Sequence, residues 1–315
     1  MAAAGSTSGS GLERSFRHED FDPAELAKAK QGRTISLCIP AKNEEATVGA
    51  IVERIIAQLV VDVALLDEVL VLDDGSTDAT AKVARAAGAR VESTMELLPE
   101  LPRGTGKGEA LWKSVYASTG DLIVWVDADI VNFGPHFLTG LLGPLVTDRS
   151  VGFSKGFYDR PIAGQVSTGG RVTELVARPT VSLLHPQLSW LVQPLSGEYA
   201  GRRDVLESVP FVQHYGVDIG LLIDISRQFG IDAIVQVDLG ERVHRNRTLD
   251  ELSPQSLMVM QTAITKAAIQ GVDAVVNPTL VRPGLPPLAV PFVQRPPLDT
   301  LPSYRARHTR LQHDA

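Results

Sequence analysis

Apolar segments alternate with amphipathic segments along most of this chain. Residues 34–40, 68–73 and 122–129 are apolar runs with β-branched side chains, which is typical of strands buried in a parallel sheet. Residues 48–59 carry apolar side chains three and four positions apart, which predicts a helix with one buried face. Strands are also predicted over 89–92, 151–158 and 233–237, and helices over 23–30, 109–117, 219–229 and 253–270, with a further apolar segment at 137–146. This alternation predicts an α/β fold.

The composition is that of a globular protein without basic excess. Of its 315 residues, 44% are hydrophobic and 21% are charged, and the formal net charge is -7. Phosphate neutralisation needs a surplus of Lys and Arg, so no nucleic-acid partner is expected. The single cysteine, Cys38, excludes an internal disulfide and suits a reducing compartment. Acidic residues interrupt the most apolar stretch, 55–72, so we expect a cytoplasmic protein with no membrane partner.

The chain divides into three parts by composition. Residues 1–22 begin with small, Gly- and Ser-rich sequence and are predicted to be a disordered tail. Residues 23–250 carry the alternating strands and helices of one α/β domain. Residues 251–315 hold an amphipathic helix and a Pro-rich segment that either packs on the domain or stays loose.

Two carboxylates end the apolar run 122–129. Asp127 and Asp129 would point to the same side if the strand continued through them. Two oxygen donors at the carboxyl end of a strand suit a divalent cation with positions left for phosphate oxygens. An acidic turn without a ligand is the alternative.

Polar loops follow the earlier strands in the same way. Asn43 and Glu45 come after the first strand, and Asp73 and Asp74 after the second. Because ligands of open parallel sheets bind at the carboxyl ends of the strands, these loops are expected to meet a ribose or a base. Simple strand-to-helix turns remain possible.

Three later segments carry cationic or glycine-rich sequence. Residues 104–109 lack the P-loop spacing, since Lys107 is followed by Gly108, yet Lys107 can still reach a nucleotide. Gly170, Arg171 and Thr173 open a predicted helix, so they form either an anion site or an ordinary cap with a solvated Arg. Residues 241–247 form the densest basic cluster, and its histidine, His244, can complete a metal site.

Together these groups are what a nucleotide-diphosphate-sugar transferase requires. Acidic groups would hold the ribose and a metal, the metal would neutralise the departing diphosphate, and cations would support it. An Asp-x-Asp motif alone is a weak signal, but the order and spacing of the whole set are fairly specific.

In these segments the chain resembles the actinobacterial glucosyl-3-phosphoglycerate synthases, which are GT-A glycosyltransferases. The resemblance covers about residues 32–250, with Gly-Gly-Arg at 169–171 and Pro-Leu-Ser-Gly-Glu-Tyr at 194–199 as its discriminating blocks. Matching segments are 40–47, 72–78, 106–112, 127–129, 168–179, 193–200 and 244–246. It implies a Rossmann-like α/β fold with a mixed central sheet, a donor half over about 32–130, an acceptor half over 131–250, and a C-terminal helical extension.

The resemblance also implies the reaction and its residues. The enzyme would transfer a hexose from a nucleotide sugar, with UDP-glucose as the favoured donor, to the hydroxyl of 3-phosphoglycerate. The anomeric configuration would be retained, and Mg²⁺ or Mn²⁺ would assist. The resemblance also implies a homodimer with contacts from the C-terminal part of the chain. Metal positions are Asp129 and His244, supported by Asp127, and acceptor positions are Gly170, Arg171 and Thr173. Donor positions are Pro40, Ala41, Asn43, Glu45, Asp74, Lys107, Asp127, Ala128, Tyr215, Asp218, Arg242 and Asn246, and the catalytic candidates are Asp218, Glu198 and Arg242.

Two positions depart from the family pattern. Asp74 stands where a serine is expected, and Asp218 where a glutamate meets the sugar hydroxyls. The shorter acid leaves GDP-mannose, the donor of the related mannosyl-3-phosphoglycerate synthases, as an alternative. A further alternative is an inverting GT-A enzyme acting on a polyprenyl phosphate or glycan, although Glu198 is followed by Tyr199 where an acidic pair would be expected. The third alternative is a nucleotide-binding regulator without enzymatic activity.

Overall fold

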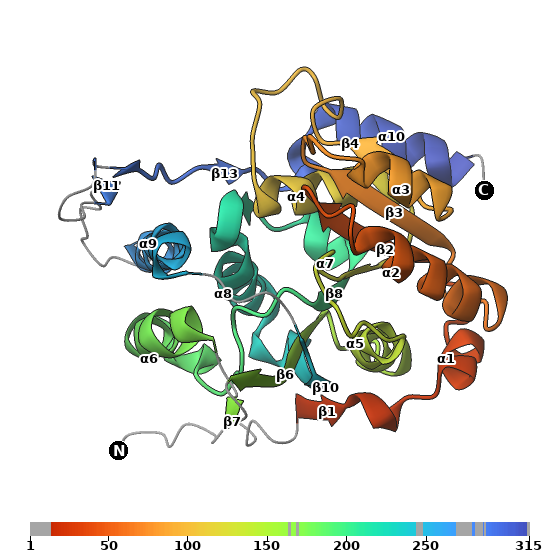
Figure 1. Cartoon of the computed structure of the whole chain (residues 1–315), viewed down its shortest axis with the longest axis horizontal. Helices are drawn as coiled ribbons and strands as arrows, with labels where there is room; N and C mark the ends of the chain where they lie inside the picture. Colours follow the sequence, from red (N-terminus) through yellow and green to blue (C-terminus); the bar gives the residue numbers. More distant parts are fainter. Residues whose placement is uncertain are drawn as a thin grey trace, which may run out of the picture.

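The structure is a computed structural model that describes residues 14–162, 165–167, 170–243, 248–268, 279–280, 286 and 288–313. Among these residues the main sheet has nine strands in the order β1-β10-β6-β8-β5-β2-β3-β4, with β7 paired to β6 (Figure 1). They are β1 Ser15–Arg17, β2 Ile35–Ala41, β3 Glu68–Asp73, β4 Arg90–Ser93, β5 Leu122–Trp125, β6 Phe153–Ile162, β7 Gln165–Ser167, β8 Tyr199–Arg202 and β10 Ile234–Glu241. Strand β8 is antiparallel to both β5 and β6, which confirms the mixed sheet.

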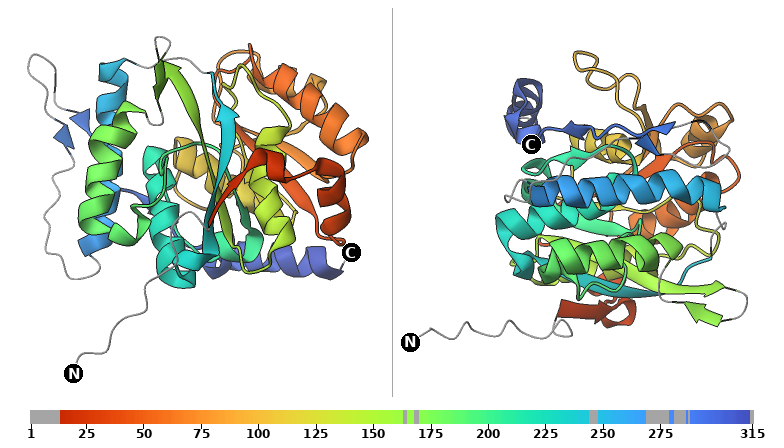
Figure 2. Two further views of the ribbon diagram at one scale, coloured as in Figure 1. Left: turned by 90° about the horizontal axis from the view of Figure 1, so that it is seen from below. Right: turned by 90° about the vertical axis from the view of Figure 1, so that its left-hand side faces the viewer.

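Helices cover both faces of this sheet (Figures 1 and 2). One face carries α1 Pro23–Ala29, α2 Val48–Ile55 with its π-helical continuation η3 Ile56–Val61, α3 Thr80–Ala86 and α5 His136–Thr147. The other carries α4 Lys107–Ala117, α7 Arg203–Glu207, α8 Val217–Phe229 and α10 Pro302–His313. Beyond α8 lie η4 Thr173–Ala177, α6 Arg178–Leu184 and α9 Leu249–Ala268. The short connecting helices are η2 His18–Asp20, η5 Pro186–Leu188, η6 His214–Gly216, η7 Ile231–Ala233 and η8 Leu298–Thr300.

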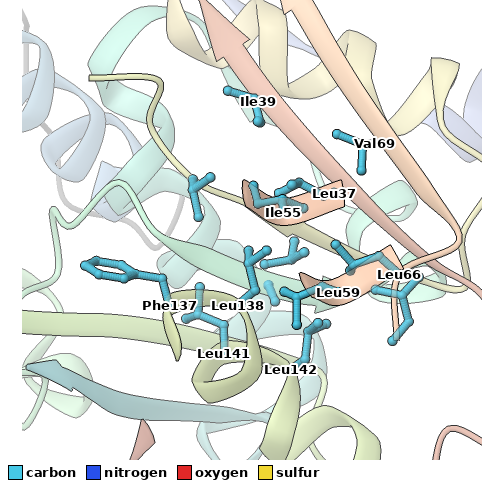
Figure 3. Packing of buried hydrophobic residues seen from close by; sticks show 14 of the residues in the cluster. Leu37, Ile39, Ile55, Leu59, Leu66, Val69, Phe137, Leu138, Leu141 and Leu142 are labelled. Carbon is cyan, nitrogen blue, oxygen red and sulfur yellow. The ribbon is translucent and has the colours of Figure 1, made fainter. Parts of the chain in front are cut away.

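The apolar patterning of the sequence explains the two cores. Alternate residues of β2 face opposite sides, so Leu37 and Ile39 belong to the core under α2 and α5, while Cys38 belongs to the core under α4. Figure 3 shows the first core, where Ile55 of α2 and Leu138 of α5 approach β2. Burial raises the pKa of the Cys38 thiol to about 12, so it serves as core filling, as predicted.

Two sequence predictions are wrong about where elements end. The expected tail over 1–22 contains ordered structure, because Ser15–Arg17 form β1, which pairs in parallel with β10. The strand expected over 122–129 ends at Trp125, so Asp127 and Asp129 stand in the following turn. In both cases a local apolar pattern could not show where hydrogen bonding to a distant strand begins or stops.

The C-terminal extension packs on the domain. Helix α9 lies along α6 (Figure 2), and β13 Gln294–Arg295 pairs with β9 Phe211–Val212. Leu298 and Tyr304 are buried in the core under α4. A second small sheet joins β11 Thr279–Leu280 to β12 Leu288–Ala289. Within the described residues no helix is long and apolar enough to cross a membrane.

Candidate active site

Acidic and basic side chains from distant parts of the chain meet beyond the carboxyl end of β5. One guanidinium nitrogen of Arg242, Nη2, lies 3.0 Å from Asp127 Oδ2 and 2.8 Å from Asp129 Oδ1. Both carboxylates therefore face one point, as predicted, although they stand in a turn and not on a strand. Arg242 follows β10, so the fold joins sequence positions more than a hundred residues apart.

A second cation completes the cluster from the opposite side. Lys107, at the start of α4, places Nζ 3.1 Å from Asp127 Oδ1 and 3.6 Å from Asp218 Oδ1. The hydroxyl of Tyr199 donates to Asp218 Oδ1 at 3.2 Å. The structure thus brings together Asp127, Asp129, Lys107, Asp218 and Arg242, all of which the sequence proposed as site residues.

Burial and neighbouring charges shift the pKa values of three side chains in this cluster. Burial alone would raise the pKa of Asp127, but Lys107 and Arg242 outweigh it and hold that pKa well below its usual range. Burial would likewise lower the pKa of Lys107, and the carboxylates of Asp127 and Asp218 hold it well above its usual value. Burial and the Asp218 carboxylate raise the pKa of Tyr199, so its hydroxyl remains a donor.

Glu198 lies beneath this cluster. Its side chain is fully buried, with Oε1 3.4 Å from Arg242 Nη1. The same guanidinium nitrogen donates to the Tyr158 hydroxyl at 2.8 Å. An acid enclosed in this way cannot approach an incoming hydroxyl from solvent, so Glu198 is a poor candidate for a catalytic base and a better counter-ion for Arg242.

The acids fit a divalent cation. The side chains of Asp127 and Asp129 remain 24% and 31% exposed, so carboxylate oxygens are open to a ligand from solvent. Hard oxygen donors of this kind are what Mg²⁺ and Mn²⁺ prefer. The described residues contain no cluster of three potential metal ligands. His244, the third predicted ligand, and Asn246 lie outside them.

The loops after β2 and β3 are tied to each other at the same sheet edge. Asn43, with a positive φ of 58°, donates its backbone N–H to Ser76 Oγ and accepts from Thr77 N through Oδ1. Glu45 Oε2 accepts from Ala79 N at 2.8 Å. Asn43 and Glu45, which were predicted to bind the nucleotide sugar, therefore hold the two loops together. This structural role could not be inferred from the residue types alone.

Five other residues predicted to bind the nucleotide sugar lie in or beside the same loops and η6. Asp74 accepts from Thr94 Oγ1 at 3.0 Å and from Gly106 N at 3.3 Å, directly before Lys107. The carbonyl of Ala41, next to Pro40, accepts from Asp74 N, and the carbonyl of Ala128 accepts from Thr47 Oγ1. Tyr215 lies in η6, just before Asp218.

The predicted acceptor residues stand apart from these contacts. Gly170 accepts the first helical hydrogen bond, from Glu174 N, and Thr173 is buried. Arg171 is exposed and lines a groove of 330 Å³ between η4 and α9. The other residues lining that groove are mainly apolar, and none belongs to the acidic cluster.

Sequence reasoning missed two residues of the cluster, Lys155 and Tyr199. They are cross-strand neighbours on β6 and β8, and Lys155 Nζ lies 4.2 Å from the Tyr199 ring centroid. Lys155 is 1% exposed and donates to the Ser196 carbonyl at 2.8 Å. A lysine within an apolar strand was the available signal, because buried lysines are rare without a role.

Replacing Gly197 by alanine is expected to lower kcat about 10–100-fold, since small displacements of reacting groups carry costs of this size. A Cβ at this position would lie 2.1 Å from Asp127 Oδ2, and Asp127 cannot move freely because Lys107 and Arg242 hold it. Steady-state kinetics would measure the change. Gly152→Ala is the control, because its Cβ would lie 3.1 Å from Val205 Cγ2 and at ordinary contact distance from Ala233, and it would meet none of the acids. Equal rates in the two variants would contradict the packing argument.

Lys155 is expected to make stability depend on pH. Burial lowers its pKa from 10.5 to about 8, with neighbouring acids opposing the shift. Between these values the unfolded chain binds more protons than the folded one, so this group makes the free energy of unfolding rise with pH. Relative to Lys155→Met, the wild-type protein should gain about 2–3 kcal/mol between pH 7 and pH 10.5 in urea unfolding. A difference independent of pH would refute the assignment.

Comparisons with known proteins agree with this geometry. The family description "Glycosyl transferase family 2" matches residues 36–208. A glucosyl-3-phosphoglycerate synthase from Petrotoga mobilis is 43% identical over 95% of this chain and 97% of its own length. The solved structure of the Mycobacterium tuberculosis synthase, in complex with Mn²⁺, UDP-glucose and phosphoglyceric acid, is 47% identical with a TM-score of 0.80, covering 89% of this chain and 95% of that one. Mannosyl-3-phosphoglycerate synthase from Rubrobacter xylanophilus is 35% identical with a TM-score of 0.86, covering 92% and 98%.

The fold and the site thus define a GT-A glycosyltransferase. The chain belongs to glycosyl transferase family 2 and, within it, to the glucosyl-3-phosphoglycerate synthase family.

Proposed function

We propose that this enzyme transfers glucose from UDP-glucose to the hydroxyl of 3-phosphoglycerate with retention of configuration. The observation that carries this is the cluster in which Asp127, Asp129 and Asp218 meet Lys107 and Arg242. It combines acids for a metal with cations for a diphosphate, and it stands in a chain 47% identical to a protein solved with Mn²⁺, UDP-glucose and phosphoglyceric acid.

In this proposal each residue of the cluster has a distinct task. Asp129, Asp127 and His244 hold Mn²⁺ or Mg²⁺, which supplies Lewis-acid stabilisation of the leaving diphosphate. Lys107 adds a cation fixed in place before the donor arrives, so that little reorganisation is needed as negative charge develops. Asp218, oriented by the Tyr199 hydroxyl, faces the sugar. Asp74, beside the loop that carries Lys107, faces the ribose.

Retention is the stereochemical outcome that the acids favour. An inverting transfer needs a carboxylate that can accept the proton of the incoming hydroxyl. Glu198 is fully buried against Arg242, and Asp218 is engaged by Lys107 and Tyr199. Neither acid is placed as an accessible base, so we expect the acceptor hydroxyl to attack from the face that the diphosphate leaves.

GDP-mannose is the second candidate donor. Asp218 is one methylene shorter than the glutamate expected there, and the mannosyl synthase from Rubrobacter xylanophilus has a TM-score of 0.86. The test is a matrix of UDP-glucose, GDP-glucose, UDP-mannose and GDP-mannose, each with 3-phosphoglycerate and Mn²⁺. We expect UDP-glucose to give the highest kcat/KM. A preference for GDP-mannose would overturn the choice of donor, and no transfer from any of the four would overturn the reaction.

Arg171 is proposed to bind the acceptor phosphate, with Gly170 and Thr173 forming the rest of the loop. A charged hydrogen bond of this kind contributes about 1.5–3 kcal/mol. Arg171→Ala should therefore raise the KM for 3-phosphoglycerate about 10–100-fold and leave the KM for the donor unchanged. Arg178, which pairs with Glu174 at 2.8 Å on the neighbouring turn, provides the matched control for loss of a charge. A change in donor KM would show that the loop has been misassigned.

We also propose that a second copy of the chain packs on the apolar residues of the groove between η4 and α9 and leaves Arg171 open to the acceptor. Leu175 and Leu249, which line it, are 75% and 67% exposed, and Leu257 and Met260 extend the apolar lining, which is a large apolar area for a surface left to solvent. Sedimentation equilibrium should give twice the chain mass of 33.9 kDa. We place the dimer in the cytoplasm, where 3-phosphoglycerate is formed.

A further inference from the structure

The C-terminal segment 293–296 lies across the donor side of the domain. In β13, Arg295 pairs with Phe211 of β9, and the Val293 carbonyl accepts from Gln213 N at 3.0 Å. The indole N–H of Trp112, on α4, donates to the Pro296 carbonyl at 3.0 Å. Figure 1 shows β13 running toward α4. The segment therefore bridges β9 and α4, two elements far apart in sequence from it and from each other.

Arg295 anchors this segment to a buried acid. Its Nε lies 2.7 Å from Glu109 Oε2 and its Nη2 2.9 Å from Glu109 Oε1. The side chain of Glu109 is fully buried, and Lys113 Nζ approaches Oε1 to 3.2 Å. Arg295 Nη2 also donates to the Pro102 carbonyl at 2.5 Å. Such a fork-to-fork pair fixes orientation as well as distance, which a single ammonium group cannot do.

The anchored acid borders the glycine-rich segment 104–108, which fails as a P-loop. A Cβ on Gly104 would lie 2.3 Å from Glu109 Oε2, and one on Gly106 would lie 2.3 Å from His214 Nδ1. A Cβ on Gly108 would lie 1.9 Å from the Val212 carbonyl oxygen of β9. These glycines therefore allow α4 to begin directly against β9 and η6, and Lys107 stands between two of them.

We propose that the C-terminal segment is part of the donor-binding machinery, with Arg295 as a positioning residue that acts through Glu109. By holding Glu109, Arg295 fixes the start of α4 and with it Lys107, whose Nζ reaches Asp127 and Asp218. By pairing with β9, the same segment fixes the strand that leads into Tyr215. The inference rests on the proposed use of a nucleotide sugar, because it assigns the segment to the donor and not to the acceptor.

The test uses the full-length protein and two readouts. Arg295→Met should raise the Kd for UDP, measured calorimetrically with Mn²⁺, about tenfold, as expected when one cationic contact to phosphate is misplaced. The KM for 3-phosphoglycerate should change less than about twofold. Without any ligand, hydrogen exchange at the amides of 104–110 should accelerate, since the segment no longer holds them.

Arg305→Met is the matched control, because it makes the same change in the same tail at a side chain that is exposed on α10. It should leave UDP affinity and exchange at 104–110 as in the wild type. Arg295→Lys keeps the charge and loses the two-pronged contact, so its Kd for UDP should lie between those of Arg295→Met and the wild type. If Arg295→Met fails to fold, Glu109→Gln takes its place and should show the same weaker binding of UDP. Folded Arg295 variants with wild-type UDP affinity and wild-type exchange would overturn the inference. Because exchange is measured without donor or acceptor, a wrong sugar or acceptor would leave this result intact and defeat only the proposed function.

Discussion

Asp129→Ala is expected to abolish detectable transfer. Asp129 follows β5, its carboxylate is 31% exposed, and it shares the Arg242 guanidinium with Asp127. In the proposed site it is a primary metal ligand, and the stabilisation that a metal gives to a leaving diphosphate is worth several kcal/mol. Its loss should therefore lower kcat by a factor of about 10³ or more at saturating UDP-glucose and Mn²⁺.

A binding measurement separates this effect from loss of fold. Asp129→Ala should unfold at nearly the wild-type temperature and bind Mn²⁺ much more weakly by electron paramagnetic resonance titration. Asp204→Ala removes an exposed acid that pairs with Arg202, and it should retain full activity and Mn²⁺ affinity. Near-normal turnover in Asp129→Ala would falsify the metal assignment.

Arg242→Met should damage both stability and catalysis. The guanidinium is 4% exposed and lies within 3.4 Å of Asp127, Asp129 and Glu198. Burial lowers the pKa of Arg242, but Glu198, Tyr158 and the two aspartates raise it well above the usual value, so the guanidinium stays charged. Removing one partner of a buried ion pair costs about 3–5 kcal/mol, because the other charge stays buried without compensation.

The double variant Arg242→Met with Glu198→Gln tests the cause of this loss. Removing the stranded carboxylate should restore a large part of the unfolding free energy in urea titrations, while kcat remains low because Asp127 and Asp129 have lost their shared cation. If Arg242→Met alone unfolds at the wild-type denaturant concentration, the guanidinium does not compensate Glu198 and the description of the buried cluster is wrong.

Much of the fold could be predicted because its central strands are local apolar patterns. The run at 68–73 coincides with β3, and the helix expected from residue 219 begins as α8 at Val217. The site acids Asp127 and Asp129 could also be found, since side chains that follow parallel strands collect at one sheet edge. Lys107 was indicated by its glycine-rich loop, and Asp218 by the family resemblance. Asp127, Lys107 and Asp218 meet there as expected.

The parts that could not be predicted depend on distant pairing. Strand β1 has three residues and exists because β10 lies beside it, and no period within so short a segment shows this. The Lys155–Tyr199 contact requires the register of β6 against β8. The place of residues 293–296 depends on the contact of Arg295 with Glu109, a buried acid that the sequence pattern does not distinguish from other helix residues.

The anomeric configuration of the product decides whether the enzyme transfers glucose to 3-phosphoglycerate with retention. The wild-type enzyme would be incubated with UDP-glucose, ¹³C-labelled in the sugar, together with 3-phosphoglycerate and Mn²⁺, and the first product formed would be followed by NMR. We expect an α-linked glucosyl-3-phosphoglycerate, which keeps the configuration of the donor. A β-linked product, or release of free glucose with no glycosidic product, would contradict it.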